Sequence, residues 1–597
     1  MQIAKYSIGI DLGTTNTLLA FAEMRVDQPR VDVLSIPQVV APGQIESLES
    51  LPSFVYLPSD SDISGGMLAM PGRTAKEPVV GSYARQISAE QPDRVVAAAK
   101  SWLCHHQVDR HAAILPWNAS KEVAKISPVE ASRLILQHVV AAWSAAFPAA
   151  PLAEQYVTLT VPASFDMAAR ELTREAAISA GLPEDFVLLE EPQAAVYHWL
   201  NRKGDLWRRE LTEGDLLLVV DVGGGTTDLT LVRVTQESGE LVLRRLAVGN
   251  HLLVGGDNMD LTLAHFAATK FAEKGTKLNA WQAVSLWHAC RKAKESLLSA
   301  SDKKTESISV LGRGSKLIGG TVTVDIGRDE VHRLLADGFF APSSLDDRPA
   351  RDAASGFQEL GLPFEVDSAI TRHIAAFLSD NHEPNQSSAL ATHVLLNGGV
   401  FKSALLREKL ADVLASWHTA NERPKLLGGV DDLDRAVACG AAFYGWSKHH
   451  GGIRIRGGTA RSYYLGVETA GLAIPGIPRP LQALCVVPFA MEEGTELDVP
   501  GREVGLVVGR QVRFRFFASA NRKNDKVGTT LRDWDETELQ ETAPMELTFS
   551  AEETPQEGYV PVRFHSRVSE LGVFELWCNS TKDDQRWKLE FNVREDS

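Results

Sequence analysis

The sequence predicts an α/β domain built from two similar halves and followed by an all-β domain. One observation behind this fold class is a strand-turn-strand motif that occurs twice, at residues 8–17 and at residues 219–228. The other is a change near residue 451, after which helical periodicity gives way to strand-like alternation. An internal repeat followed by a change of periodicity indicates two half-domains and then a separate unit.

The repeated motif has the composition of a turn that holds phosphate. Each copy is an apolar strand that ends in an aspartate, followed by a turn of glycine and threonine and by a second β-rich run. Glycine lets backbone N–H groups approach an anion, threonine hydroxyls add donors, and an aspartate at a strand end can hold Mg²⁺ through water. A single Asp-x-Gly turn also fits an ordinary β-turn. Two copies instead predict one nucleotide clamped in a cleft between the two halves.

Each half contains the elements of an α/β unit. In the first half, Ser127 and Pro128 supply the N-cap and the N1 proline of a helix, and residues 156–161 alternate as a strand. Asp166 opens a second helix, which is followed by a short strand at residues 187–189. This order predicts parallel strands with helices packed on the sheet.

In the second half, residues 257–300 have helical periodicity, residues 307–325 are β-rich, and residues 367–378 are helical again. A strand at residues 392–396 then runs into Asn397. The second half therefore repeats the α/β character of the first.

The C-terminal segment has the pattern of an antiparallel β domain. Residues 512–516 and 560–564 alternate between apolar and polar side chains. Such a β-sandwich-like domain is either a scaffold or a platform that binds a peptide or a partner protein, and the pattern leaves both open.

We place the domain boundaries at the changes of pattern. Lobe I spans about residues 1–215, lobe II about 216–400, and a return to lobe I about 401–450. A linker at 451–460 precedes the β domain at 461–597.

Composition limits the classes of partner. The 597 residues allow about three or four domain-sized units, and 44% of them are hydrophobic, which is ample for folded cores. The 61 basic and 77 acidic residues give a net charge of -16, which repels nucleic acid and anionic lipid. We therefore expect neither nucleic acid nor a membrane as a partner.

The cysteines and the N-terminus predict a soluble, cytoplasmic protein. The five cysteines are scattered and contain no C-x-x-C pair, so we expect reduced thiols rather than disulfides or a zinc site. Met1 leads directly into the first apolar strand, which leaves no room for a signal peptide. No apolar run approaches the roughly 18 residues of a membrane span.

Four separated motifs resemble signatures of the DnaK-type heat-shock chaperones, and they occur in the same order. They are Asp11-Leu12-Gly13-Thr14-Thr15-Asn16, Glu191-Pro192-Gln193-Ala194-Ala195, Asp221-Val222-Gly223-Gly224-Gly225-Thr226-Thr227-Asp228 and Leu396-Asn397-Gly398-Gly399. The resemblance covers residues 6 to about 447. That family belongs to the actin and sugar-kinase ATPase superfamily. The resemblance therefore implies an α/β actin-like fold, a duplicated ribonuclease H-like two-lobed ATPase domain, with the all-β domain after it.

The resemblance also implies a site for ATP or ADP with Mg²⁺, and potassium as a further candidate cation. Asp11 and Asp221 would hold Mg²⁺ through water. The implied catalytic residues around the γ-phosphate and the attacking water are Lys100, Glu191, Thr226 and Asp228. The other residues implied to bind the nucleotide, with Thr226 again among them, are Gly13, Thr14, Thr15, Asn16, Gly223, Gly224, Gly225, Thr227, Gly255, Gly256, Lys294, Gly398, Gly399, Lys402 and Asp434.

Pro162 and Arg170 match the pair that in this family relays the nucleotide state outward, although Arg170 alone would indicate a surface salt bridge. Arg291, Glu295 and Leu298 differ from the residues that the family places around adenosine. We therefore expect adenine nucleotide binding that is weaker, or less selective for the base, than in a typical member.

The leading interpretation is a Mg-dependent chaperone-like protein that binds and slowly hydrolyses ATP, with its nucleotide state coupled to the β domain. One alternative is a nucleotide-dependent interaction switch with little turnover. Another is a sugar-kinase-like phosphotransferase, although Glu191 and Lys100 favour attack by water. Candidate partners are an unfolded peptide or a specific protein client, and a J-domain or nucleotide-exchange helper. Because no helical segment follows the β domain in this sequence, we expect no lid over a bound peptide.

Overall fold

A computed structural model describes residues 4–589 apart from short stretches. The stretches that it does not describe within this range are 71–76, 106–107, 118, 120–121, 238, 300–302, 311–321, 351–361, 363, 382–389, 419–422, 429–431, 454, 457–458, 460, 469–479, 490, 492–494, 509–510, 520, 536–537, 543–544, 549–558 and 569–573.

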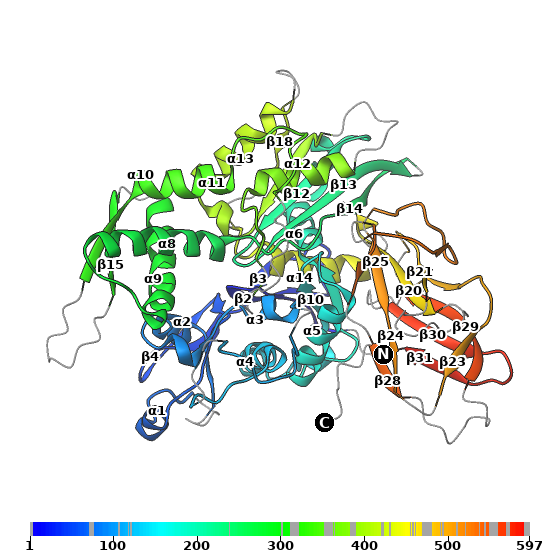
Figure 1. The fold of residues 1–597 in the computed structure, drawn as a ribbon, viewed down its shortest axis with the longest axis horizontal. Helices are drawn as coiled ribbons and strands as arrows, with labels where there is room; N and C mark the ends of the chain where they lie inside the picture. Colours follow the sequence, from blue (N-terminus) through cyan, green and yellow to red (C-terminus); the bar gives the residue numbers. More distant parts are fainter. Residues whose placement is uncertain are drawn as a thin grey trace.

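Two mixed sheets form the centre of the α/β part (Figure 1). The strands of the first are β1 (Tyr6–Leu12), β2 (Asn16–Glu23), β3 (Val31–Val33), β6 (Leu51–Pro52), β10 (Tyr156–Val161) and β11 (Val187–Glu190). The strands of the second are β12 (Leu216–Val222), β13 (Thr227–Glu237), β14 (Glu240–Val248), β17 (His393–Asn397), β18 (Lys425–Leu426) and β19 (Ile455–Arg456).

The two sheets share one strand order. The first runs β11-β10-β1-β2-β3, with β6 beside β2, and the second runs β18-β17-β12-β13-β14-β19. In each, the central strand pairs antiparallel with the next strand of the chain, β2 or β13, and parallel with β10 or β17. The strand-turn-strand repeat predicted from the sequence is therefore present as two hairpins in equivalent places.

Helices cover the first sheet on both faces. They are α3 (Ala99–Leu103), α4 (Pro128–Ala146), α5 (Met167–Ser179), α6 (Glu191–Lys203) and α14 (Ala436–His449). The short helix α7 (Trp207–Glu210) follows α6, and its Trp207 joins an apolar core with residues of the second sheet. The predicted caps are present: Ser127 Oγ accepts from Glu130 N–H at 3.0 Å, and Asp166 Oδ1 accepts from Ala169 N–H at 2.8 Å. A smaller insertion on this half contains α1 (Asp60–Gly65), α2 (Ser82–Ile87), β4 (Ile36–Ala41), β5 (Gln44–Leu48), β7 (Val55–Tyr56), β8 (Val79–Val80) and β9 (Val95–Val96).

The crossing of α6 and α14 depends on a glycine. A Cβ atom on Gly440 of α14 would overlap the carbonyl of Ala194 in α6. The absence of a side chain lets the two helices pack at backbone contact, which fixes the start of α6 against the first sheet.

The second half surrounds its sheet with a separate apolar core. Its further elements are α8 (Gly256–Glu273), α9 (Ala280–Leu298), β15 (Thr305–Val310), β16 (Val322–Gly327), α10 (Arg328–Val331), α11 (Asp337–Phe339), α12 (Ile370–Asp380) and α13 (Ala404–Ser416). All seven residues of the central strand β12 are buried, as are Val394 and Leu396 of β17. The predicted helical and β-rich segments of this half are present in the predicted order.

Strand pairing moves two of the boundaries that the sequence suggests. The predicted return to the first half at about residue 401 is too early, because β18 pairs with β17 of the second sheet. The chain returns only with α14, which packs on β1, β2 and β10. The segment predicted as a linker also contains β19, which pairs parallel with β14 at the edge of the second sheet, while residues 454, 457–458 and 460 lie outside the described residues.

After the linker segment the described residues form strands and no helix (Figure 1). One sheet contains β20 (Ser462–Glu468), β21 (Leu481–Val487), β25 (Phe516–Ser519), β26 (Thr530–Leu531) and β27 (Gln540–Glu541). Another contains β22 (Glu496–Asp498), β23 (Val504–Val507), β29 (Tyr559–Val568), β30 (Phe574–Ser580) and β31 (Arg586–Leu589), and a separate pair joins β24 (Gln511–Phe514) to β28 (Met545–Thr548). Apolar residues from both larger sheets form one core, as in a β-sandwich.

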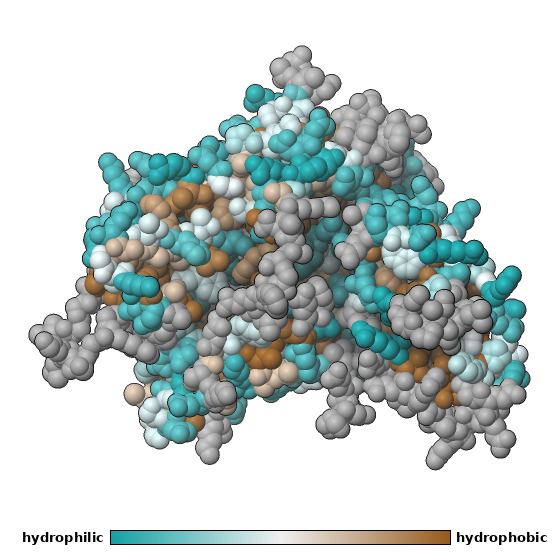
Figure 2. Space-filling view, viewed as in Figure 1, coloured by the Kyte–Doolittle hydropathy of each residue, from teal (hydrophilic) through white to brown (hydrophobic). Residues whose placement is uncertain are grey.

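Figure 2 shows hydrophilic residues interspersed with groups of apolar residues on the described part of one face. Within the described part of the chain, every helix is too short or too polar to cross a bilayer.

Candidate nucleotide-binding site

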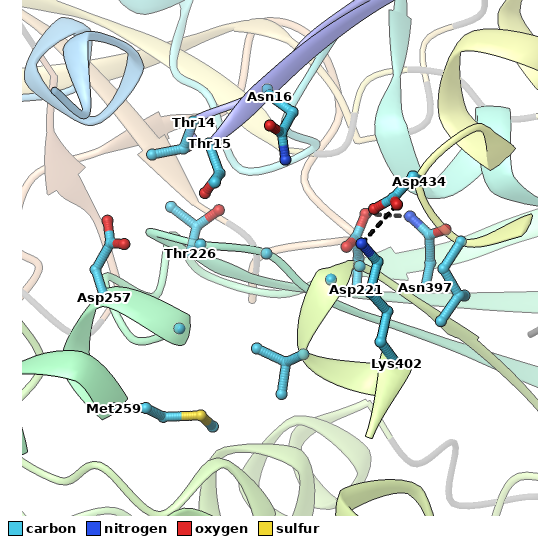
Figure 3. A pocket seen from close by; sticks show the side chains of 18 of the residues that line it. Thr14, Thr15, Asn16, Asp221, Thr226, Asp257, Met259, Asn397, Lys402 and Asp434 are labelled. Atoms are coloured by element: carbon cyan, nitrogen blue, oxygen red, sulfur yellow. Dashed lines mark hydrogen bonds and ion pairs between the residues drawn. The ribbon is translucent and has the colours of Figure 1, made fainter. Parts of the chain in front are cut away.

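A cavity of about 410 Å³ lies where the two repeated hairpins meet (Figure 3). Both sheets and the helices α8, α9, α13 and α14 contribute to its lining. The residues predicted from the sequence that line it are Asp11, Gly13, Thr14, Thr15, Asn16, Lys100, Glu191, Asp221, Gly223, Gly224, Thr226, Asp228, Gly256, Lys294, Gly398, Gly399, Lys402 and Asp434. The structure therefore brings together side chains that are more than four hundred positions apart in the sequence.

The tips of the two hairpins touch. A Cβ atom on Gly224 would overlap Thr15 Oγ1, and one on Gly225 would lie 3.0 Å from Thr14 Cγ2 and 2.7 Å from Ser101 Oγ. Figure 3 shows Thr14 and Thr15 of the first turn next to Thr226 of the second. Glycine at these positions lets two rows of backbone N–H groups and hydroxyls border one small space.

Two aspartates lie near the ends of the central strands. Asp11 is the second-last residue of β1, and Thr160 Oγ1 donates to its Oδ1 at 3.3 Å. Asp221 is the second-last residue of β12, and Asn397 Nδ2 donates to its Oδ2 at 2.7 Å. Burial raises the pKa of both carboxyls, that of Asp221 to about 7, and the nearby carboxylate of Asp228 adds to the rise for Asp221. The site thus concentrates negative charge that water alone solvates poorly.

Lys100 and Glu191 form a buried ion pair beside these aspartates. Burial raises the pKa of Glu191 to about 8 against the opposing effect of Lys100, and Asp11 contributes to the rise. Burial lowers the pKa of Lys100, but Glu191 and Asp11 outweigh it and the net pKa is raised. Lys100 follows Ala98, whose φ of 54° lies in the left-handed region that alanine avoids, so the fold holds this turn against local strain.

Asp228 is held on three sides. Ser164 Oγ–H donates to its Oδ1 at 2.6 Å, and Ser164 N–H donates to the same atom at 3.3 Å. Thr226 Oγ1 donates to Oδ2 at 3.3 Å. These bonds fix the plane of the carboxylate at the mouth of the second turn.

These geometric features agree with a comparison of the sequence with known families. The family described as Hsp70 protein matches residues 7–341. The chain belongs to the Hsp70 family. Members of this family are chaperones and ATPases that bind ATP or ADP with Mg²⁺, so the resemblance to DnaK-type chaperones is confirmed.

Similar curated proteins of the Hsp70 family are also known. The chain is 29% identical over 330 residues to the chaperone protein HscA homolog of Bordetella pertussis (strain Tohama I). The aligned region covers 53% of this chain and 45% of that protein. It is 28% identical over 309 residues to the chaperone protein HscA homolog of Bordetella petrii, covering 50% of this chain and 42% of that protein. The matched regions thus span less than half the length of these relatives.

One side of the cavity of this Hsp70 member is filled by ion pairs that the sequence reasoning missed. Arg291 donates to Asp257 Oδ1 at 2.6 Å and to Asp260 Oδ2 at 2.8 Å, and Lys294 lies 2.7 Å from Asp260 Oδ1. The sequence did contain a signal for these ion pairs. It has two acids three residues apart on α8 and two bases three residues apart on α9. Arg291 also lies over the ring of Phe54, which belongs to the other half of the domain.

The remaining residues near the expected adenosine position are also paired. Lys402 contacts Asp434 at 2.5 Å, and Figure 3 shows the pair at the edge of the cavity. Glu295 accepts two hydrogen bonds from Arg85 of α2, at 3.0 and 3.1 Å, and α2 belongs to the other half of the domain. The basic side chains predicted to contact adenosine are therefore already engaged with acids.

Five predicted residues lie outside the cavity lining, namely Gly225, Thr227, Gly255, Pro162 and Arg170. Thr227 Oγ1 donates to Val254 O at 2.7 Å, and Gly255 packs on the carbonyls of Gly223 and Gly224, so both support the second turn.

Arg170 participates in a buried network of ion pairs. Its Nη2 donates to Glu190 Oε1 at 3.0 Å, and Arg245 pairs with the other oxygen of Glu190. Burial raises the pKa of Glu190, but the two arginines outweigh it and the net pKa is lowered. Arg170 is thus more than the surface salt bridge that its sequence context would indicate.

Proposed function

We propose that the chain is a Mg-dependent ATPase of the Hsp70 type whose nucleotide state is coupled to its β domain. One observation carries the proposal: the two glycine-threonine turns meet at a cavity that also holds Lys100, Glu191 and Asp228. A site that must stabilise a γ-phosphoryl transition state needs this combination of N–H donors, a cation and carboxylates that orient water.

The residues of the cavity fit a nucleotide and a divalent cation. The volume of about 410 Å³ is within the range of small-molecule sites. Burial raises the pKa of the half-buried Asp11 and of the buried Asp221, and the positive charge of a nearby cation would oppose that rise. Asn397 Oδ1 is buried and has no hydrogen-bond partner among the described residues, so a donor such as a metal-bound water fits beside it.

We assign the metal position to Asp11 and Asp221, acting through water molecules. The described residues contain no cluster of three or more His, Cys, Asp or Glu side chains that converges on one metal ion. When bound, Mg²⁺ would neutralise charge on the β- and γ-phosphates. Potassium remains a second candidate cation.

Each catalytic residue has a separate task in this proposal. Lys100 supplies positive charge next to the γ-phosphate, and Glu191, at the start of α6, holds the ammonium group in place. Thr226 offers its hydroxyl from the second turn. Asp228 accepts a hydrogen bond from the attacking water, because Ser164 and Thr226 leave lone pairs of its carboxylate free.

The two halves would be the two lobes of an actin-like domain, with the nucleotide joining them. The base and ribose would lie between α9 and the turn at Gly398 and Gly399. Because Lys294 and Lys402 are already paired with acids, adenosine would gain fewer new bonds, and affinity would depend mainly on the phosphates. We therefore expect modest selectivity for the base.

Coupling would run through Pro162, Arg170 and the linker segment to the β domain. That domain would bind an unfolded peptide or a specific client, and a J-domain or nucleotide-exchange partner would regulate turnover. The match to a chaperone family supports this assignment. The β domain, a sandwich with an apolar core, also supports it.

A second candidate is a nucleotide-dependent switch with little turnover. The direct pairing of Lys100 with Glu191 favours it, because a lysine neutralised by a buried carboxylate stabilises developing phosphate charge less.

Single-turnover hydrolysis of ATP by wild type, Lys100→Ala and Thr226→Ala separates these candidates. An ATPase should lose about 100-fold or more in rate in Lys100→Ala, with binding of MgATP largely retained. Lys270→Ala is the matched control, because Lys270 pairs with Glu330 far from the cavity and its loss should leave the rate unchanged. Equal, near-zero rates in all four proteins would favour the switch. Titration calorimetry with ATP, ADP and GTP, with and without Mg²⁺, would contradict both if no nucleotide bound.

A further inference from the structure

Ser164 and His251 form a hydrogen-bonded chain that ends on Asp228. Ser164 Oγ lies 2.6 Å from Asp228 Oδ1 and 2.7 Å from His251 Nδ1. Ser164 is 4% exposed, and neither residue lines the nucleotide cavity. Ser164 therefore joins a carboxylate of the site to an imidazole outside it.

Backbone pairing holds His251 in this place. After β14 the chain runs back along β13: Gly249 N–H donates to Leu229 O at 2.8 Å, and Thr227 N–H donates to Leu252 O at 3.0 Å. The His251 ring also makes an edge contact with Phe165, with centroids 5.9 Å apart at 71°. The position of the imidazole is thus set by the same strand that carries Asp228.

The direction of the hydrogen bonds follows from the number of protons. A carboxylate only accepts, so the single hydroxyl proton of Ser164 points to Asp228. His251 Nδ1 must then carry a proton and donate it to Ser164 Oγ. This tautomer leaves Nε2 as an acceptor, and Nε2 is buried without a hydrogen-bond partner among the described residues.

We propose that Ser164 and His251 are positioning residues for ATP hydrolysis, which hold the carboxylate of Asp228 in one orientation. The role rests on the proposed ATPase function. The donor chain holds Oδ1 of Asp228 on Ser164, so that Oδ2, beside Thr226, keeps a free lone pair for the attacking water. Without Ser164 the carboxylate would rotate and lose this orientation.

Single-turnover rates test the positioning role. Ser164→Ala and His251→Leu should lower the hydrolysis rate about tenfold or more, with the Kd for MgATP changed less than threefold. His251→Asn should retain most of the rate, because its side-chain N–H can take the place of Nδ1–H. Ser132→Ala is the matched control: Ser132 is a buried serine whose hydroxyl bonds Pro128 O within α4. A Ser164→Ala rate equal to that of Ser132→Ala, or a loss in His251→Asn as large as in His251→Leu, would overturn the proposal.

Nitrogen NMR of the histidines in the nucleotide-free protein needs no turnover and so separates this inference from the proposed function. We expect His251 to carry its proton on Nδ1 and Ser164→Ala to change that preference. An Nε2–H tautomer in an active enzyme would contradict this inference alone. An inactive wild type would contradict the proposed ATPase, and the positioning role with it.

Discussion

At the scale of single residues, the site is a group of buried charges in which each charge changes the others. Asp221, Asp228 and Glu191 are all buried near Lys100, and one ammonium group cannot neutralise three carboxylates. Burial raises the pKa of Glu191 and Asp221, and the neighbouring carboxylates add to the rise. Removing one carboxylate should therefore stabilise the empty protein and impair the site.

We predict that Asp221→Asn stabilises the nucleotide-free protein, and more at pH 8 than at pH 5. The pKa of Asp221 is about 7 in the folded state against 3.8 for an ordinary aspartate, so its contribution to stability is full below about pH 4 and is lost as pH rises to about 7. The amide avoids this loss and still accepts from Asn397. Thermal or denaturant unfolding should show a gain of about 2–4 kcal/mol at pH 8. The same variant should lose Mg-dependent ATP binding; a variant less stable than wild type at pH 8 would contradict the prediction.

The residue types in the sequence predicted many of these buried charges. They did not predict which acid pairs with which base. The two aspartates and the lysine occur in recognisable motifs, because their spacing within each motif is local. The pairs Arg291 with Asp257 and Lys294 with Asp260 join different helices, and no local pattern states which base meets which acid.

At the scale of elements, the shape of the site depends on the contact between the two hairpins. Their contact depends on glycine at the tip of the second turn, where Thr15 of the first turn occupies the space of a side chain on Gly224. Any added atom must separate the turns, and with them the backbone N–H groups and hydroxyls that we propose as phosphate donors.

Gly224→Ala should therefore weaken binding of MgATP by tenfold or more with a change in unfolding free energy of about 1–2 kcal/mol at most. Gly338→Ala is the control, because a Cβ atom there meets nothing within 4 Å. Titration calorimetry together with denaturant unfolding measures both quantities. Equal affinity in the two variants would show that the turns can separate without consequence.

Helix caps and hairpins were predictable at this scale, whereas the sheet to which a short strand belongs was not. Ser127 and Asp166 begin their helices as predicted, because a cap depends on the next three residues. β18 has only two residues, and its pairing with β17 is a tertiary fact that the sequence did not reveal.

At the scale of the whole molecule, the linker segment is part of the second sheet. β19 adds to β14 as an edge strand, and Ile455 N–H donates to the hydroxyl of Tyr197 on α6 at 2.9 Å. The segment that leads to the β domain thus contacts an element of each half. Relative motion of the halves would disturb it.

Tyr197→Phe should loosen this segment. Loss of a hydrogen bond worth about 1 kcal/mol predicts a several-fold faster cleavage of the linker by a protease under conditions where local opening limits access. Tyr56→Phe is the control, since Tyr56 is equally buried and its hydroxyl bonds Asp62 and Gln91 far from the linker. Identical cleavage rates in the two variants would mean that the hydroxyl contributes nothing to docking.

The sequence by itself determined the two glycine-threonine turns, the strands and helices that carry them, and the change to a β domain. Glycine, threonine and aspartate at fixed offsets, and the period of apolar residues, are local properties that the chain states directly. Only the tertiary structure decided that the turns touch, that Ser164 joins His251 to Asp228, and that the linker docks on β14. Each of these contacts joins residues far apart along the chain, and its geometry exists only after both sheets have packed.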